Sequence, residues 1–165
     1  MAQIAKHTVD LAESVVDAAD LFPRIFNCLK DTDINVRKNS AACIREIAKQ
    51  NPTLAKLIVN AGGAAAIVDY ISEARGNARL PGIMTLGYIS SFDEALAMGV
   101  IISKGIGPLK DALVTEPEDH IRAASAWSLG QIGRHGSDHA RALAEDDVPA
   151  RLLAAYIDEA SSENL

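Results

Sequence analysis

The sequence predicts an all-α protein, a right-handed solenoid of about three to four stacked three-helix units. The first reason is internal repetition, because NVRKNSAACIREIAKQ, NARLPGIMTLGYISSF and HIRAASAWSLGQIGRH begin at residues 35, 77 and 120 and align at offsets of 42 and 43. The second reason is that no stretch of useful length alternates apolar and polar residues as a half-buried strand does. A unit of this size cannot bury its own apolar stripe, so it must stack on its neighbours.

Each unit contains a long helix, a short helix and a third helix. Long helices are predicted at about 35–49, 77–91 and 120–134 from their apolar spacing. Short helices follow in PTLAKLIVNAGG, EALAMGVIISKG and DHARALAEDD, and third helices in PRIFNCLKD, AAAIVDYISEA, GPLKDALVTE and PARLLAAYIDEA. We therefore expect one continuous solenoid with a partial unit at 1–34, full units at 35–76 and 77–119, and a last unit with a tail at 120–165.

The residues between these segments suit helix ends. Pro81 is acceptable only in a first helical turn, where its missing N–H has no partner to lose. Glycines are expected to supply positive φ at helix ends, and short polar residues to cap helix N-termini. The residues concerned are Gly62, Gly63 and Gly105 for the first role, and Asp31, Asp33, Asn35 and Asn77 for the second.

Composition excludes several classes of function. A net charge of −6 argues against nucleic acid as the main partner. No uninterrupted apolar run of about 18 residues occurs, so no membrane span is expected. Cys28 and Cys43 form no CxxC pair and are expected to be buried free thiols in a reducing compartment.

Catalytic chemistry is not indicated either. His135 and His139 have the i, i+4 spacing of metal ligands, but Gly136 interrupts the helix between them and no third ligand is spaced nearby. No Ser, Cys or carboxylate stands in a recognisable catalytic arrangement. The sequence therefore predicts no enzyme, no metal and no cofactor.

The three-helix unit resembles the armadillo repeat. GIGPLKDAL and ASAWSLGQIG are similar to its third-helix and long-helix segments. The HEAT repeat is the competing assignment, but three helices and a Gly-rich break favour the armadillo unit. In armadillo arrays the long helix lines a concave groove.

The position of the single tryptophan suggests which surface lines that groove. At about 100° per residue, Trp127 points at least about 120° away from Ile121, Leu129 and Ile132 on the same helix. The repeat alignment shows which residues of the other two long helices lie on the helix face equivalent to that of Trp127. Together these faces predict an apolar strip with cations around it, which is typical of a protein-binding surface. Its residues are Trp127, Gln131, Arg134, Tyr88, Met84, Leu80, Arg45, Lys49 and Lys38. The alternative is that Trp127 packs on Tyr88 of the adjacent unit and only fills the groove wall.

Two further features of the long helices bear on partners. Nuclear import receptors carry a ladder of Trp and Asn four residues apart, whereas the equivalent pairs here are Ala42/Glu46, Met84/Tyr88 and Trp127/Gln131. Because only one Trp and no Asn remain, and the groove is itself basic, binding of a basic peptide is not favoured. Arg37, Arg79 and Arg122 also fall in register; we expect them to stack between units and to pair with loop acids such as Asp31, Asp33 or Glu118. Docking of acidic protein tails is the alternative role.

Specific segments resemble one family. RLPGIMTLGYIS and PEDHIRAASAWSLGQIGRHGSDHARA resemble the sperm-associated antigen 6 family, armadillo proteins of the central-pair apparatus of cilia and flagella. The resemblance implies a non-enzymatic scaffold in the cytoplasm and cytoskeleton, at the axoneme, that supports central-pair microtubules and flagellar motility. It implies central-pair proteins as partners, with acidic segments such as tubulin tails attracted to the cations of the groove. The alternative is a soluble armadillo adaptor or a nuclear-transport-type peptide receptor.

Members of that family have several times more repeats, so the chain is expected to be a C-terminal fragment. A cut solenoid exposes an apolar end. We expect self-association through such a patch at the N-terminal end. Its residues are Ile4, Val9, Leu11, Val15 and Val16.

Overall fold

A computed structural model describes residues 8–17 and 21–162 of the chain. These residues form helices throughout and contain no strand, so the predicted all-α fold class is confirmed. The elements are α2 (Val9–Asp17), α3 (Leu21–Cys28), α4 (Ile34–Ala48), α5 (Pro52–Asn60), α6 (Gly63–Glu73), the 3-10 turn η1 (Gly76–Ala78), α7 (Leu80–Phe92), α8 (Glu94–Ile102), α9 (Ile106–Thr115), α10 (Asp119–Gly133), α11 (Ser137–Glu145) and α12 (Val148–Ser162).

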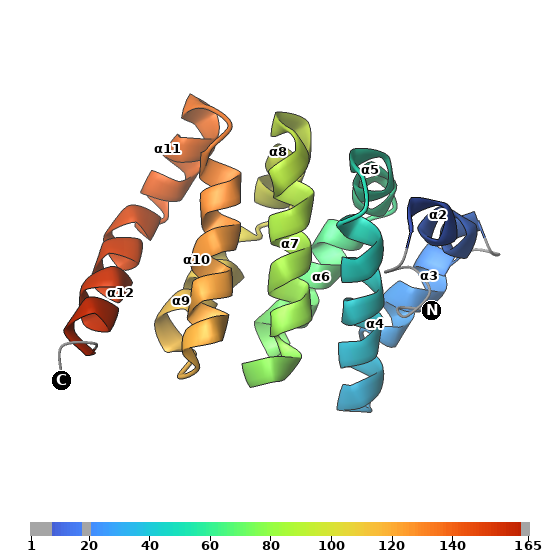
Figure 1. Cartoon of the computed structure of the whole chain (residues 1–165), viewed down its shortest axis with the longest axis horizontal. Helices are drawn as coiled ribbons and strands as arrows, with labels where there is room; N and C mark the ends of the chain where they lie inside the picture. The colour runs from blue at the N-terminus through green and yellow to red at the C-terminus, as the bar shows by residue number, and fades with distance from the viewer. Residues whose placement is uncertain (1–7, 18–20, 163–165) are drawn as a thin grey trace.

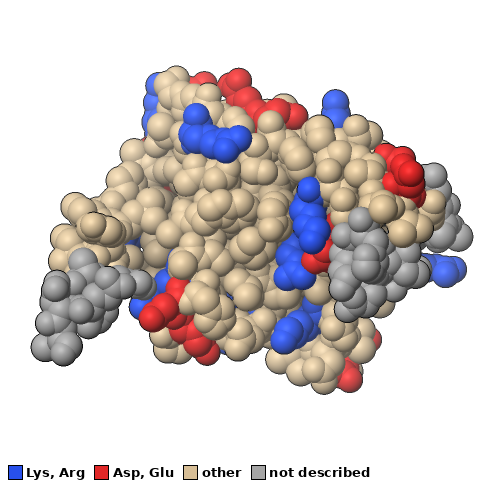
Figure 2. All heavy atoms as spheres, viewed as in Figure 1, with Lys and Arg blue, Asp and Glu red and all other residues tan. Residues whose placement is uncertain are grey.

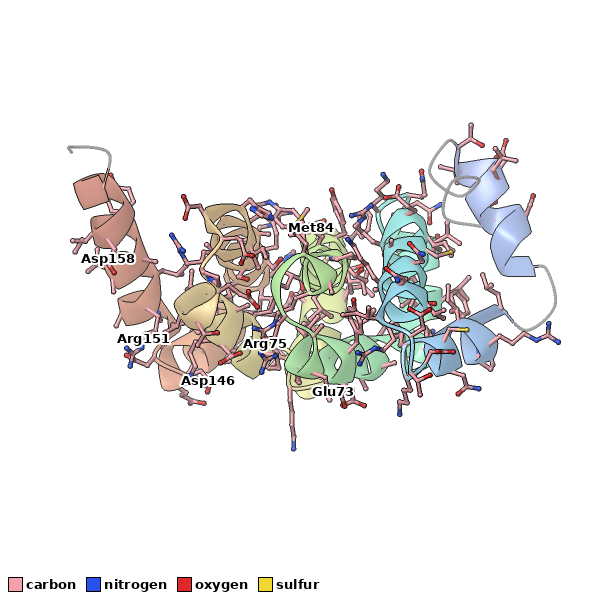
Figure 3. All side chains as sticks on the ribbon, turned by 90° about the horizontal axis from the view of Figure 1, so that it is seen from below. Glu73, Arg75, Met84, Asp146, Arg151 and Asp158 are labelled. Carbon is pink, nitrogen blue, oxygen red and sulfur yellow. The ribbon has the colours of Figure 1, made fainter. Side chains whose placement is uncertain are left out.

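The helices stack along one axis as a solenoid. Figure 1 shows the long helices α4, α7 and α10 side by side in front, with α5, α8 and α11 along the upper edge and α6 and α9 behind. Seen from below, the array bends into an arc, with Met84 of α7 toward its inner side and Glu73 and Asp146 on its outer side (Figure 3). The long helices therefore form the inner surface of the arc.

The helix starts mostly follow the local chemistry of the sequence. Asp33 caps α4 by accepting a bond from the Asn35 N–H, and Pro81 lies in the first turn of α7 as expected. Asn77 does not cap a helix, because residues 76–78 form the 3-10 turn and α7 begins three residues later than predicted. Asn51 and Asp93 cap the short helices α5 and α8 through their side chains.

Left-handed residues precede the third helices α6, α9 and α12. Gly62 has a φ of 82° as predicted, but Gly63 begins α6 and Gly105 has a φ of −69°, so the prediction was wrong for these two. The left-handed residues of the next two units are Lys104 and Asp147, with φ values of 63° and 59°. Their spacing from Gly62, 42 and then 43 residues, reproduces the sequence repeat in the backbone itself.

The core repeats with the same period. Ile44, Leu86 and Leu129 hold equivalent places on the three long helices, and each is fully buried. The triad Ile47, Ile89 and Ile132 is fully buried as well. These positions belong to one continuous apolar core that extends from Leu21 to Val148, with α7 packed between α4 and α10. The long helices are thus fixed by their buried stripe, which leaves the opposite stripe for the inner surface.

The predicted apolar patch at the N-terminal end lies only partly within the described residues. Val9 and Leu11 are 36% and 41% exposed. Ile4 and the side chains of Val15 and Val16 lie outside the described part, so self-association through this end stays a prediction.

No helix among the described residues is long and apolar enough to cross a membrane by itself. Within residues 8–17 and 21–162, one pair, α5 and α6 taken together, reaches the length and composition of a span, with a bend of 79° between the two helices. Both contribute to the core of the solenoid through Leu54, Ile58 and Ile67.

Candidate protein-binding groove

All nine predicted groove residues belong to the long helices or their C-caps, and they divide into two parts. Lys38, Arg45 and Lys49 belong to α4 and its C-cap. Leu80, Met84 and Tyr88 lie on α7, and Trp127, Gln131 and Arg134 on α10 and its C-cap. In Figure 2, Lys and Arg atoms gather along α4, whereas the surface over α7 and α10 is mostly uncharged. The two parts are therefore a charged end and an aromatic end.

The aromatic end is centred on Tyr88 and Trp127. Their rings meet edge to face across the boundary between two units, with centroids 5.2 Å apart and an interplanar angle of 69°. Both side chains are half-buried. One side of the indole therefore packs on the adjacent unit, as the alternative interpretation expected, and the rest stays accessible on the surface.

A glycine makes this contact possible. A Cβ added to Gly87 would lie 2.2 Å from Cζ3 of Trp127 and 2.5 Å from Oγ of Ser128. Ser128 is fully buried, and its hydroxyl lies 3.0 Å from the Ile83 carbonyl oxygen and 2.9 Å from that of Ala124. Gly87 thus lets α10 approach α7 closely enough for the six-membered ring of the indole to contact the α7 backbone, a feature that sequence reasoning missed.

Polar side chains of α10 and α11 tie the end of α7. Arg134 donates to the Ser91 carbonyl at 2.7 Å, and Nε2 of His135 lies 2.6 Å from the Ser90 carbonyl. Nε2 of the fully buried His139 lies 3.0 Å from the Glu94 carbonyl. The Ser90 and Ser91 carbonyls lie in the last turn of α7, where helical acceptors lack partners, whereas Glu94 begins α8. The histidine pair therefore has a structural use, and in the described part of the chain no group of three His, Cys, Asp or Glu side chains could hold a metal ion.

The charged end is organised by a residue that the sequence analysis did not assign to the site. The carboxylate of Glu46 is buried, accepts bonds from Arg45 Nε and Nη2 at 3.0 and 2.6 Å, and pairs with Lys49 Nζ. Burial alone would raise the pKa of Glu46, but its hydrogen bonds and charge contacts with Lys49 and Arg45 outweigh burial and lower the pKa below 4.5. Two cations and one carboxylate leave a single net positive charge here, with exposed Lys38 on the same helix.

Arg37 and Arg79, two of the three arginines in register, pair with acids other than the predicted loop acids. Arg79 is fully buried and contacts Asp111 and Glu116, at 2.7 and 3.2 Å. Arg37 reaches Glu73 at 3.5 Å. These acids belong to or follow the third helix of the same unit, so these two pairs brace their own units internally. Arg122 instead donates to the Glu116 carbonyl of the preceding unit at 3.2 Å and pairs with Asp119 at 2.7 Å. Asp33 is unavailable for such pairing because it caps α4.

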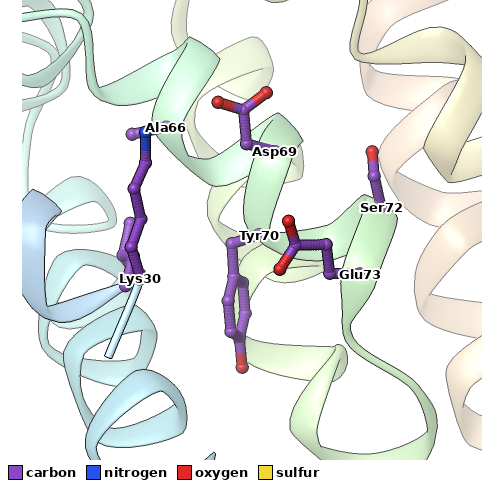
Figure 4. A pocket seen from close by; sticks show the side chains of 7 residues that line it. Lys30, Ala66, Asp69, Tyr70, Ser72 and Glu73 are labelled. Atoms are coloured by element: carbon purple, nitrogen blue, oxygen red, sulfur yellow. The ribbon is translucent and has the colours of Figure 1, made fainter. Parts of the chain in front are cut away.

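A cavity of about 350 Å³ on the outer side is a weaker candidate. Lys30 on one side faces Asp69 and Glu73 on the other, with Tyr70 between them (Figure 4). Burial raises the pKa of Tyr70, against the effect of the nearby Arg37 charge, and its hydroxyl donates to the Ala78 carbonyl. Since Tyr70 and Glu73 already have protein partners, this cavity offers few unused polar groups.

Comparison with solved structures decides the fold. Over 91% of this chain and 62% of its own, a designed armadillo repeat protein in complex with the peptide (KR)4 superposes with a TM-score of 0.85 at 17% identity. The fold is that of an armadillo solenoid. A second set of designed armadillo proteins, made for modular peptide recognition, matches with a TM-score of 0.82 at 18% identity over 89% of this chain and 61% of theirs.

Sequence comparison finds a repeat model and two natural proteins that are similar to this chain. The HEAT repeat model matches residues 21–50, which contain α3 and α4. Sperm-associated antigen 6 of Homo sapiens is 55% identical over 57 residues, or 34% of this chain, and the protein of Mus musculus is 56% identical over the same length. The match spans about a tenth (11%) of the length of these curated relatives. Fold and relatives together support a repeat scaffold for protein interaction, a class that is typically non-enzymatic.

Proposed function

We propose that this armadillo solenoid is a non-enzymatic scaffold of the ciliary and flagellar central pair, where it binds proteins through its inner groove. The identity with sperm-associated antigen 6 supports this assignment, because that family is known from the central-pair apparatus. The proposed place is the axonemal cytoskeleton. The proposed consequence of binding is stable central-pair microtubules and flagellar motility.

The accessible Tyr88–Trp127 pair is the observation that carries the proposal. Aromatic side chains beside an arginine dominate many binding surfaces, and Arg134 follows Trp127 by two turns of α10. The pair is already held in one geometry by Gly87 and Ser128, so little ordering entropy is lost when a partner binds. Lys38 and the net positive Arg45–Glu46–Lys49 cluster would attract acidic segments, of which tubulin tails are the proposed example.

The test is binding of the chain to taxol-stabilised microtubules, by co-sedimentation, with and without removal of their acidic tails. The double variant Trp127→Ala, Tyr88→Ala should weaken binding at least about tenfold, because it removes both anchors. Ile102→Ala is the matched control, since Ile102 is an apolar side chain, 74% exposed, on α8 outside the groove. Lys38→Glu is a second test at an exposed position and should weaken binding most at low salt.

Circular dichroism separates binding from packing. If the double variant loses helical signal, Tyr88 and Trp127 are packing residues. The Lys38→Glu result then decides whether the groove binds microtubules. Equal binding by Lys38→Glu and the unmodified chain, with tails present, would contradict the proposed contact.

A peptide receptor of the nuclear-transport type is the second candidate, favoured by one observation: a structural neighbour was solved with the basic peptide (KR)4. Glu46 is the only carboxylate among the ladder positions of this groove, and it is already paired with Arg45 and Lys49. Titration of the chain with (KR)4 should therefore show no saturable binding, and tight binding would favour this second function.

A further inference from the structure

Glu46 is the one acidic residue of α4, and it is more deeply buried than the cations of the charged end. Its side chain is 7% exposed, whereas the side chains of Arg45 and Lys49 are 31% and 34% exposed. A molecule that enters the groove therefore contacts the two cations before it contacts the carboxylate. Glu46 adds almost no surface to the groove, yet it determines how these cations are paired.

Glu46 already occupies the donors that a partner would use. Arg45 donates from both Nε and Nη2 to one oxygen, Oε1, and Lys49 pairs with Oε2. Arginine commonly binds a carboxylate through two such donors. A partner's carboxylate can use them only by displacing Glu46, and displacement leaves a buried carboxylate without its bonds, which costs free energy. Glu46 is therefore an internal competitor of an acidic partner.

The cations of the charged end form a line along α4, where Lys and Arg atoms gather in Figure 2. Lys38, Arg45 and Lys49 are seven and then four residues apart, so at about 100° per residue they share one face of the helix. At a rise of about 1.5 Å per residue, the line is about 16 Å long. An extended polypeptide covers this length with about six residues, so one acidic run can contact all three cations.

A run of acidic residues and a single acidic residue compete with Glu46 differently. A single carboxylate exchanges one ion pair for another and gains little. In a run, a residue paired with the exposed Lys38 holds the following residues close to Arg45 and Lys49, where they compete at a high effective concentration. The arrangement therefore favours a segment with several neighbouring acidic residues.

We propose that Glu46 determines the specificity of the charged end, by competing with acidic partners for Arg45 and Lys49 so that only runs of acidic residues bind. This inference rests on the proposed function, in which the groove binds an acidic segment. It predicts an effect opposite to that of changing Lys38, Tyr88 or Trp127. Removing the Glu46 carboxylate should strengthen binding, because the two cations lose their internal partner.

The probe is a fluorescein-labelled peptide of six glutamates between glycines, added to the full chain at low salt, where charges are screened least. Fluorescence anisotropy should show saturable binding of this peptide. A peptide of the same length with one glutamate among glutamines should show none. Glu46→Gln should strengthen binding of the six-glutamate peptide about tenfold, since the bonds of Arg45 and Lys49 become available to it.

Glu73→Gln is the matched control. It removes the same charge from a side chain that is 73% exposed, pairs with Arg37 and lies on the outer side of the array (Figure 3). Binding should then change by less than about twofold. Glu46→Met is a second variant in case the buried amide of Glu46→Gln disturbs the fold. It should strengthen binding as well, because an apolar side chain of similar size needs no polar partner.

The outcomes separate this inference from the proposed function. If Glu46→Gln and Glu46→Met bind the six-glutamate peptide no more tightly than Glu73→Gln does, Glu46 only holds the cations in place. The inference is then overturned, while acidic binding by the groove stands. Equal binding of the two peptides to the unmodified chain would overturn it as well. If no chain binds the six-glutamate peptide, the acidic contact of the proposed function fails together with this inference.

Discussion

The two ends of the inner groove occupy equivalent helix positions but are held together in different ways. Glu46 of α4 and Tyr88 of α7 correspond in the repeat, at an offset of 42 residues. Glu46 pairs with cations one residue before and three residues after it on its own helix. Tyr88 contacts Trp127 of the next unit. The charged end is therefore organised within one helix and the aromatic end between two.

This contrast shows where the repeat constrains the sequence. Core positions such as Ile47, Ile89 and Ile132 face the same packed environment in each unit, so they carry the same side chain. Groove positions contribute little to that core and can carry an acid, an aromatic ring or an amide. The groove is where one unit differs chemically from the next.

The largest expected effect comes from breaking the aromatic end. Gly87→Ala should destabilise the fold by about 2 kcal/mol, because overpacking against Trp127 and Ser128 outweighs the gain of about 1 kcal/mol in helix propensity. Gly130→Ala is the matched control. Gly130 is the equivalent position on α10, nothing lies within 4 Å of an added Cβ, and the change should stabilise the fold by up to about 1 kcal/mol. Urea unfolding measures both, and a neutral Gly87→Ala would mean that the indole can move aside.

An intermediate effect is expected at the charged end. Glu46→Gln should cost about 1 to 2 kcal/mol near neutral pH, because it removes a buried carboxylate bonded to Arg45 and Lys49. The lowered pKa of Glu46 fixes the sign of the pH dependence. Its stabilisation is complete above the unfolded-state pKa of about 4.5 and is lost as the pH falls through the lower folded-state pKa.

The measurement is therefore the difference in unfolding free energy between the unmodified chain and Glu46→Gln at several pH values. This difference should be constant from about pH 6 to 7 and should shrink below about pH 4.5. A difference that stays the same down to pH 3 would contradict the proposed role of the ion pairs.

The smallest effect on stability is expected at Lys38, an exposed residue of α4. Lys38→Ala should leave the unfolding free energy unchanged within about 0.5 kcal/mol. It should still slow association with an acidic partner at low salt, since a surface cation acts on encounter more than on folding. Stopped-flow measurement of the association rate at two salt concentrations would show this effect. An association rate that does not depend on salt would mean that Lys38 takes no part in binding the partner.

The buried stripe was predictable from the sequence because apolar side chains at helical spacing leave few other packings. The position of Pro81 in a first turn follows from an equally local rule. The left-handed residue before α9 was not predictable in the same way. Lys104 takes that conformation beside a glycine that does not. A Cβ added to Gly105 would lie 2.6 Å from Cγ1 of Val100, so this position needs glycine for space and not for a positive φ.

Within the site, the pairing of Tyr88 with Trp127 was foreseen as an alternative, whereas the roles of Gly87 and Glu46 were missed. Each left a signal in the sequence. A glycine in the middle of a helix costs about 1 kcal/mol and usually marks close packing, and a carboxylate three residues before a lysine is a common helical pair. The partners of Arg79 could not be found this way, because Asp111 and Glu116 approach it only through the fold.

The bonds at the end of α7 also bear on how the array deforms. Arg134, His135 and Ser128 join the α10 segment to three backbone carbonyls of α7. Among the described residues, we find no side-chain hydrogen bond or ion pair that joins α4 to α7 in this way. Under a bending load, α7 and α10 should move together as one rigid body. We expect α4 to rotate relative to that body, because only apolar contacts hold it to α7. Such a load would then change the width of the basic end while leaving the aromatic end intact.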